Sequence, residues 1–83
     1  MKGLGKMSYK FTDEEREEIR ICKGRCASRK ALKRLEALEM RAGGQRNREI
    51  SEKTGFHPQY VTVLVSRYKN RGLAGIIDER EIK

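Results

Sequence analysis

Apolar residues recur at spacings of three and four along much of the chain, and glycines separate the resulting stretches. Between residues 28 and 42 the apolar positions are Ala31, Leu32, Leu35, Leu38 and Ala42. Lysine, arginine and glutamate fill the positions between them, so this spacing predicts an amphipathic helix with one buried stripe. Gly43 and Gly44 follow it, and glycine readily adopts the left-handed conformation that ends a helix.

A shorter helix is predicted before this one. Thr12 and Glu15 have the spacing of a capping box, in which each side chain bonds to the backbone of the other residue. Acidic residues fill the first turn, where the positive end of the helix dipole favours them. We therefore expect a helix over residues 13–22, with Gly24 as its end.

Two more helices are predicted on either side of Gly55. The first covers residues 47–54, with Ile50 as its main buried anchor. The second covers residues 58–70, and Pro58 suits its first turn because the missing N–H has no helical partner there. Together the four stretches predict a small all-α domain.

The last of these helices has two different faces. At about 100° per residue, its apolar residues fall in one sector and point to the core: Val61, Leu64, Val65 and Tyr68. The opposite side, which we call the outward face, carries uncharged residues: Gln59, Thr62, Val63, Ser66 and Asn70. Solvated helix surfaces usually carry glutamate and lysine, whereas these side chains suit hydrogen bonds to bases and contact with a thymine methyl group.

The residues around Gly55 follow the spacing of a helix-turn-helix unit. Ile50 seats the first helix, Gly55 permits the sharp turn and Phe56 fills the corner. Val61 and Leu64 lock the second helix against the first. This register predicts that residues 58–70 form a recognition helix for the DNA major groove.

Basic residues outnumber acidic residues most strongly in the middle of the chain. The net charge is +8, with +2 over residues 1–26, +7 over residues 27–72 and −1 over residues 73–83. No acidic residue lies between Glu52 and Asp78. Because phosphates repel carboxylates and attract lysine and arginine, this distribution favours double-stranded DNA as the partner.

The predicted DNA contacts lie on and around the recognition helix. The residues expected to contact bases are Gln59, Thr62, Val63 and Ser66. Those expected to bind backbone phosphates, at its sides and end, are Arg67, Lys69 and Arg71. The predicted set is completed by residues near the helix ends, which are Arg46, Arg48, His57, Tyr60 and Asn70.

Several of these segments also resemble a known family. They are Asn47-Arg48-Glu49-Ile50, Gly55-Phe56, Val61, Arg67-Tyr68 and Gly72-Leu73-Ala74-Gly75-Ile76-Ile77-Asp78, with Phe11 to Arg16 and Arg29 to Gly44 upstream. The chain is similar here to the N-terminal helix-turn-helix region of mariner-like bacterial insertion-sequence transposases. The resemblance implies a homeodomain-like bundle of about four helices that recognises the terminal inverted repeats of a mobile element. It also implies that strand cleavage belongs to a separate Asp-Asp-Glu/Asp domain, which this chain does not contain.

Nothing in the sequence predicts catalysis, a cofactor or a bound metal. We find no nucleophile–base pair, phosphate-binding loop or metal-ligand set, and expect a binding module without enzyme activity. Cys22 and Cys26 with one distant histidine fall short of a zinc site. The two thiols are interpreted as incidental, with metal or redox use as the alternative.

The remaining expectations concern organisation and location. We expect a flexible basic leader over residues 1–10, the helix-turn-helix domain over residues 11–78, and a tail or the start of a linker over residues 79–83. Neither a membrane-spanning apolar run nor a signal peptide is present, which predicts a cytoplasmic protein associated with the bacterial nucleoid through DNA. Homodimerisation is left open, since no heptad seam of useful length occurs.

Two alternatives to a transposase module remain at this point. One is a stand-alone transcriptional regulator, which would use the same kind of DNA-binding domain. The other is a protein-interaction module, in which an apolar docking surface is formed by Tyr60, Val63, Ile76 and Ile77 and the positive charge is incidental.

Overall fold

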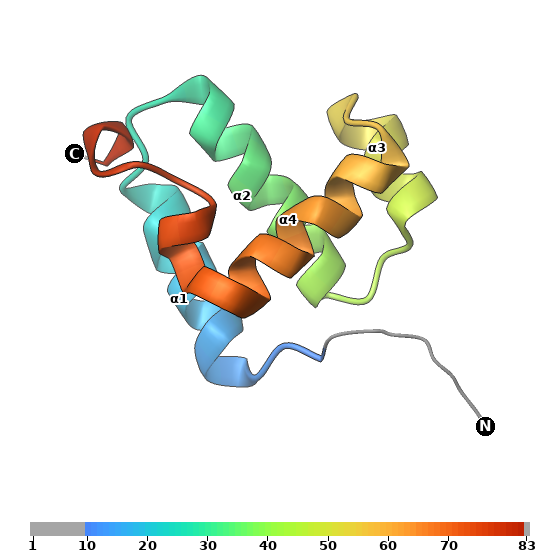
Figure 1. Cartoon of the computed structure of the whole chain (residues 1–83), viewed down its shortest axis with the longest axis horizontal. Helices are drawn as coiled ribbons and strands as arrows, with labels where there is room; N and C mark the ends of the chain where they lie inside the picture. Colours follow the sequence, from blue (N-terminus) through green and yellow to red (C-terminus); the bar gives the residue numbers. More distant parts are fainter. Residues whose placement is uncertain (1–9, 83) are drawn as a thin grey trace.

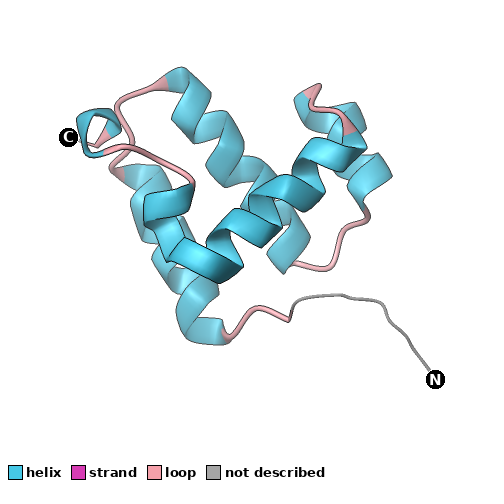
Figure 2. Ribbon diagram, viewed as in Figure 1, coloured by secondary structure: helices cyan, strands magenta, loops and turns pink. Residues whose placement is uncertain are grey.

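The computed structural model describes residues 10–82, which form four α-helices and two short 3₁₀ helices (Figure 1). In chain order they are α1 (Asp13–Gly24), α2 (Arg29–Ala42), α3 (Asn47–Thr54), α4 (Pro58–Arg71), η1 (Gly72–Gly75) and η2 (Glu79–Glu81). Short loops join them (Figure 2). The predicted all-α fold is confirmed, with helix ends within about two residues of those expected. The predicted leader lies outside the described residues, apart from Lys10.

Local hydrogen bonds explain where the first two helices begin. The capping box of α1 is confirmed: the Glu15 N–H donates to Thr12 Oγ1 at 3.1 Å, and the Thr12 N–H donates to Glu15 Oε1 at 2.9 Å. Ser28 caps α2, because its Oγ accepts the Ala31 N–H at 3.2 Å. These caps satisfy backbone donors that have no partner inside a helix.

Helix α2 is the centre of the bundle and contacts α1, α3 and α4 (Figure 1). Its buried residues are Ala31, Leu35, Ala37 and Leu38. The predicted stripe is thus confirmed at three positions, whereas Leu32 and Ala42 are only half-buried. Ala37 is buried as well, because other helices cover α2 from more than one side.

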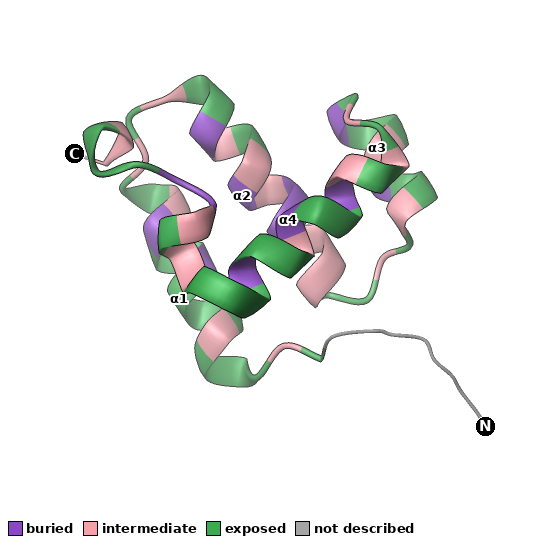
Figure 3. Cartoon of the chain, viewed as in Figure 1, coloured by how far each residue is buried: buried purple, intermediate pink, exposed green. Residues whose placement is uncertain are grey.

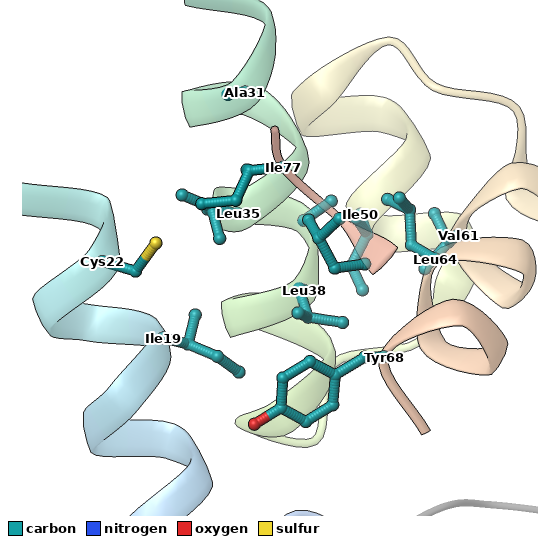
Figure 4. Close-up of a cluster of buried hydrophobic side chains, with 12 residues drawn as sticks. Ile19, Cys22, Ala31, Leu35, Leu38, Ile50, Val61, Leu64, Tyr68 and Ile77 are labelled. Carbon is teal, nitrogen blue, oxygen red and sulfur yellow. The ribbon is translucent and has the colours of Figure 1, made fainter. Parts of the chain in front are cut away.

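Each of the four α-helices contributes one or more buried residues to the core. Figure 4 shows Ile19 and Cys22 of α1 facing the α2 side chains, with Ile50 and Leu64 on the other side. The Tyr68 ring extends from α4 toward α1 and is 4% exposed. Its hydroxyl donates to Glu18 Oε1 at 3.0 Å, so α4 is tied to both α1 and α2.

The segment after α4 folds back into the core. Ile76 and Ile77 are buried, with 4% and 8% exposure. Gly75 makes this possible, because a Cβ at this position would lie 2.8 Å from the backbone oxygen of Arg67. The proposed docking surface containing Ile76 and Ile77 is therefore wrong, since a buried pair of side chains is not available to a partner.

Residues 79–82 pack against the connection between α1 and α2. The Ala27 N–H donates to the Glu81 backbone oxygen at 2.7 Å, and the Arg34 guanidinium donates to both Glu81 carboxylate oxygens at 2.8 and 2.7 Å. Cys26 and Ile82 form an isolated antiparallel β-bridge. The packed unit thus continues to Ile82, beyond the predicted boundary at residue 78.

Candidate nucleic-acid interface

The turn between α3 and α4 is fixed by backbone geometry and by one buried side chain. Gly55 has φ of 84°, a left-handed conformation, and its N–H donates to the Ser51 oxygen at 2.8 Å. Thr54 Oγ1 donates to the Ile50 oxygen at 2.7 Å and accepts the Phe56 N–H at 3.2 Å. The role of Gly55 is confirmed, whereas that of Thr54 was not predicted from the sequence.

His57 begins α4 as its N-cap residue. Its Nδ1 atom accepts the Gln59 N–H at 3.1 Å, and the following Pro58 occupies the first helical position. The Phe56 and Tyr60 rings meet edge to face, with centroids 5.0 Å apart. His57 and Tyr60 thus have structural roles at the start of α4, and their contact with DNA stays a prediction.

The rotation of α4 about its axis is as predicted. Val61, Leu64 and Tyr68 are buried, while Val65 is half-buried and packs against the same core. All members of the outward face are exposed, namely Gln59, Thr62, Val63, Ser66 and Asn70. Figure 3 shows the exposed residues along the side of α4 that is turned away from α2. The outward face is accordingly free to contact a large ligand.

The start of α3 lies beside this face. Asn47 Nδ2 donates to Thr62 Oγ1 at 2.8 Å and to the Pro58 oxygen at 3.3 Å. Arg46 and Arg48, on either side of Asn47, are exposed. Arg48 makes only a distant contact with the carboxylate of Glu52, at 3.9 Å, and both side chains are largely solvated. The two predicted arginines therefore present their charge beside one edge of α4.

The cations of α4 itself lie on both edges of the outward face. At about 100° per residue, Lys69 shares the edge of Thr62, whereas Arg67 and Arg71 share the edge of Tyr60. All three cations are exposed, and none makes an ion pair with a residue in the range 10–82. The neutral outward face is consequently bordered by positive charge on each side.

A second group of cations, missed by the sequence analysis, reaches the N-terminal end of α4 from α2. A hollow of about 580 Å³ is lined by Lys30, Lys33, Arg34, Gly55, Phe56, His57 and Tyr60. The Lys33 ammonium lies 5.4 Å from the centre of the Phe56 ring. Arg34 is paired with Glu81, which leaves Lys30 and Lys33 as the available charges. Residues 29–35 contain basic and no acidic residues, which could have indicated a phosphate contact. The sequence does not show that this part of α2 lies next to the start of α4.

Another hollow, of about 750 Å³, has the opposite character. Its lining is mainly apolar, with four acidic residues and one cation, and consists of Ile21, Cys22, Leu73, Ile82, Asp13, Glu14, Glu17, Glu18 and Arg25. A hydrogen bond from Arg20 lowers the pKa of Glu17, so this carboxylate is ionised at neutral pH. Because acids outnumber the single cation here, this surface disfavours phosphate more than the α4 side does.

The cysteines belong to the core rather than to a reactive site. Burial raises the pKa of the Cys22 thiol, and Cys26 Sγ donates to the Ser28 oxygen at 3.2 Å. Both are free thiols. Among residues 10–82, no group of three or more histidine, cysteine, aspartate or glutamate side chains is arranged to hold a metal ion. The same part of the chain contains no helix with the length and apolar character required to cross a membrane.

Comparison with known proteins agrees with this geometry. A family model described as a homeodomain-like domain matches residues 28–77. The match includes α2, the α3–α4 turn and the buried segment after η1, and it leaves α1 outside. No curated protein and no solved structure matches the chain.

Proposed function

The chain belongs to the homeodomain-like family of helix-turn-helix domains, and from this premise we propose that it binds double-stranded DNA in a sequence-specific manner. The observation that carries the proposal is the neutral, exposed outward face of α4 with cations along both edges. A helix of 14 residues is about 21 Å long and fits a major groove about 12 Å wide.

The outward face supplies the groups that distinguish bases. Gln59 carries both an amide donor and an amide acceptor, while Ser66 and Asn70 add shorter polar groups. Val63, which is 40% exposed, offers methyl groups for contact with the methyl group of thymine. This combination supports recognition of base edges rather than attraction to phosphate alone.

The edges of α4 supply the groups that hold the two DNA strands. The edge beside α3 carries Arg46, Arg48 and Lys69. The opposite edge carries Arg67 and Arg71, and the hollow at its N-terminal end adds Lys30 and Lys33. Because the major groove has a phosphate backbone on each side, the two cation groups each face one strand in our proposal.

Selection of bound duplexes from random DNA at moderate salt tests the proposal directly. We expect a short enriched sequence, and Gln59→Ala or Val63→Ala alters its preferred bases. Arg67→Ala or Lys69→Ala weakens binding to the enriched and to a scrambled duplex by equal factors, because phosphate contacts carry no sequence information. If all four variants lose affinity by the same factor for both duplexes, or if no sequence is enriched, sequence-specific binding is refuted.

We further propose that this module recognises the ends of a transposable element. The support is the resemblance to mariner-like transposases, in which strand cleavage resides in a separate domain, so the chain alone is proposed to bind without cutting. Enriched sites that match terminal inverted repeats flanking the gene would support this role. Enriched sites that match a promoter instead would favour a stand-alone transcriptional regulator.

A further inference from the structure

A cluster of exposed cations on α2 continues away from the start of α4. It consists of Arg29, Lys30 and Lys33, and we call it the α2 cation cluster. Lys30 and Lys33 line the hollow beside α4, and together with Arg29 they also line a second hollow of about 490 Å³. Leu32 and Glu36 complete the lining of the second hollow, so three cations outnumber one acid there. Positive charge therefore extends from α4 across the surface of α2.

The stability of α2 does not explain this cluster. Arg29 and Lys30 lie in the first turn of α2, which contains no acidic residue. The positive end of the helix dipole disfavours cations at this place. None of the three cations makes an ion pair with an acid in the range 10–82. No ion pair within the fold accounts for these charges, which favours a role toward an external anion.

The position of the cluster indicates which part of a duplex it meets. Arg67 and Arg71 lie on the Tyr60 edge of α4, and Tyr60 itself lines the hollow that contains Lys30 and Lys33. Arg29 lines only the second hollow, so it is the member of the cluster that lies away from α4. Cations thus continue sideways from the edge of α4 instead of ending there. A surface that extends past one edge of the major groove meets the phosphates of flanking base pairs.

We propose that the α2 cation cluster, through Arg29, binds backbone phosphates outside the base pairs that α4 reads. Arg29 and Lys33 are about 6 Å apart along the axis of α2, which suits neighbouring phosphates of one strand. Phosphates carry no base information, so the flanking base pairs add affinity without adding base preference. The bound duplex is then longer on one side than the enriched sequence. This inference rests on the proposed DNA binding and adds Arg29 to its contacts.

Binding to duplexes of different length tests the inference. The enriched sequence is placed in one long duplex and in two shortened duplexes, each of which lacks the flanking base pairs at one end. At about 100 mM salt, Arg29→Ala should bind the long duplex about 5- to 10-fold more weakly than the natural chain does, the counterion contribution of one phosphate contact. This deficit should disappear on one shortened duplex, persist on the other and be independent of the flanking sequence.

Matched variants separate the phosphate contact from other effects of the substitution. Arg16→Ala removes the same charge from α1, where Arg16 lines a hollow with Glu39, and should bind each duplex as the natural chain does. Arg29→Lys keeps the charge and should retain the preference for the long duplex. Thermal unfolding by circular dichroism checks the fold. Arg29→Ala should be at least as stable as the natural chain, because it removes a cation from the positive end of the α2 dipole.

The outcomes separate the inference from the proposed function. If a sequence is enriched and Arg29→Ala binds the long duplex as tightly as the natural chain does, the inference is overturned and specific binding stands. A deficit of equal size on all three duplexes also overturns it, because the contact then lies within the base pairs that α4 reads. Failure of the natural chain to enrich any sequence overturns the proposed function and, with it, this inference.

Discussion

Replacement of Arg67 by alanine tests directly whether the cations of α4 bind DNA phosphates. Arg67 is exposed on the Tyr60 edge of α4 and makes no ion pair within residues 10–82, so its charge is available to a phosphate. Each phosphate contact contributes about 0.9 to the slope of log affinity against log salt concentration. With about seven contacts from the cations along both edges of α4, the expected slope is about −6.

This slope corresponds to a large loss of affinity over a modest range of salt concentration. Between 50 and 200 mM salt the affinity should fall by about 4,000-fold for the natural chain. Arg67→Ala should reduce the slope by about 0.9, which makes the fall about 3.5-fold smaller over the same range. Fluorescence anisotropy with an enriched duplex and a scrambled duplex measures both slopes, and the change should be the same for the two.

Two further variants test whether DNA binds on the α4 side of the domain. Lys33→Ala, in the hollow at the N-terminal end of α4, should reduce the slope by a similar amount. Arg16→Ala removes the same charge from α1, where Arg16 lines a separate hollow with Glu39, and should leave the slope unchanged. An Arg67→Ala slope equal to that of the natural chain, or an equal change in Arg16→Ala, would refute the placement of DNA on α4.

Three predictions concern stability. Gly75→Ala should lower the free energy of unfolding by about 1–3 kcal/mol, measured by urea titration, because its methyl group meets an α4 backbone oxygen at 2.8 Å. Tyr68→Phe should cost about 1 kcal/mol in the same titration, since it removes the hydrogen bond to Glu18; no loss contradicts that role. The pKa of Glu81 is lowered by the hydrogen bond from the Asp78 N–H and then by Arg34. The ionised Glu81 side chain therefore contributes fully to the free energy of unfolding above pH 4.5, and this contribution is lost as the pH falls through the lowered pKa. Thermal unfolding from pH 7 to pH 3 should show Glu81→Gln less stable only at the higher pH values, and a constant difference would contradict this.

Local spacing along the chain is enough to predict the helices and to predict which side of α4 is buried. The capping residues Thr12 and Ser28, the turn glycine Gly55 and the helix-starting Pro58 act on backbone groups within about four positions of themselves. The faces of α4 follow from a fixed angle per residue, which no distant contact alters. For this reason the buried and exposed sides of α4 could be predicted before any packing was known.

Contacts between helices depend on how the bundle closes, and only the tertiary structure decides them. Asn47 meets Thr62 across 15 positions, and Arg34 meets Glu81 across 47. The lysines of α2 reach the N-terminal end of α4 only because α2 passes beside Phe56 at the turn. Such pairs leave no periodic signal, because helix packing and not residue spacing brings their side chains together. The hydrogen bond from Asn47 to Thr62 on the outward face is one of these contacts between helices.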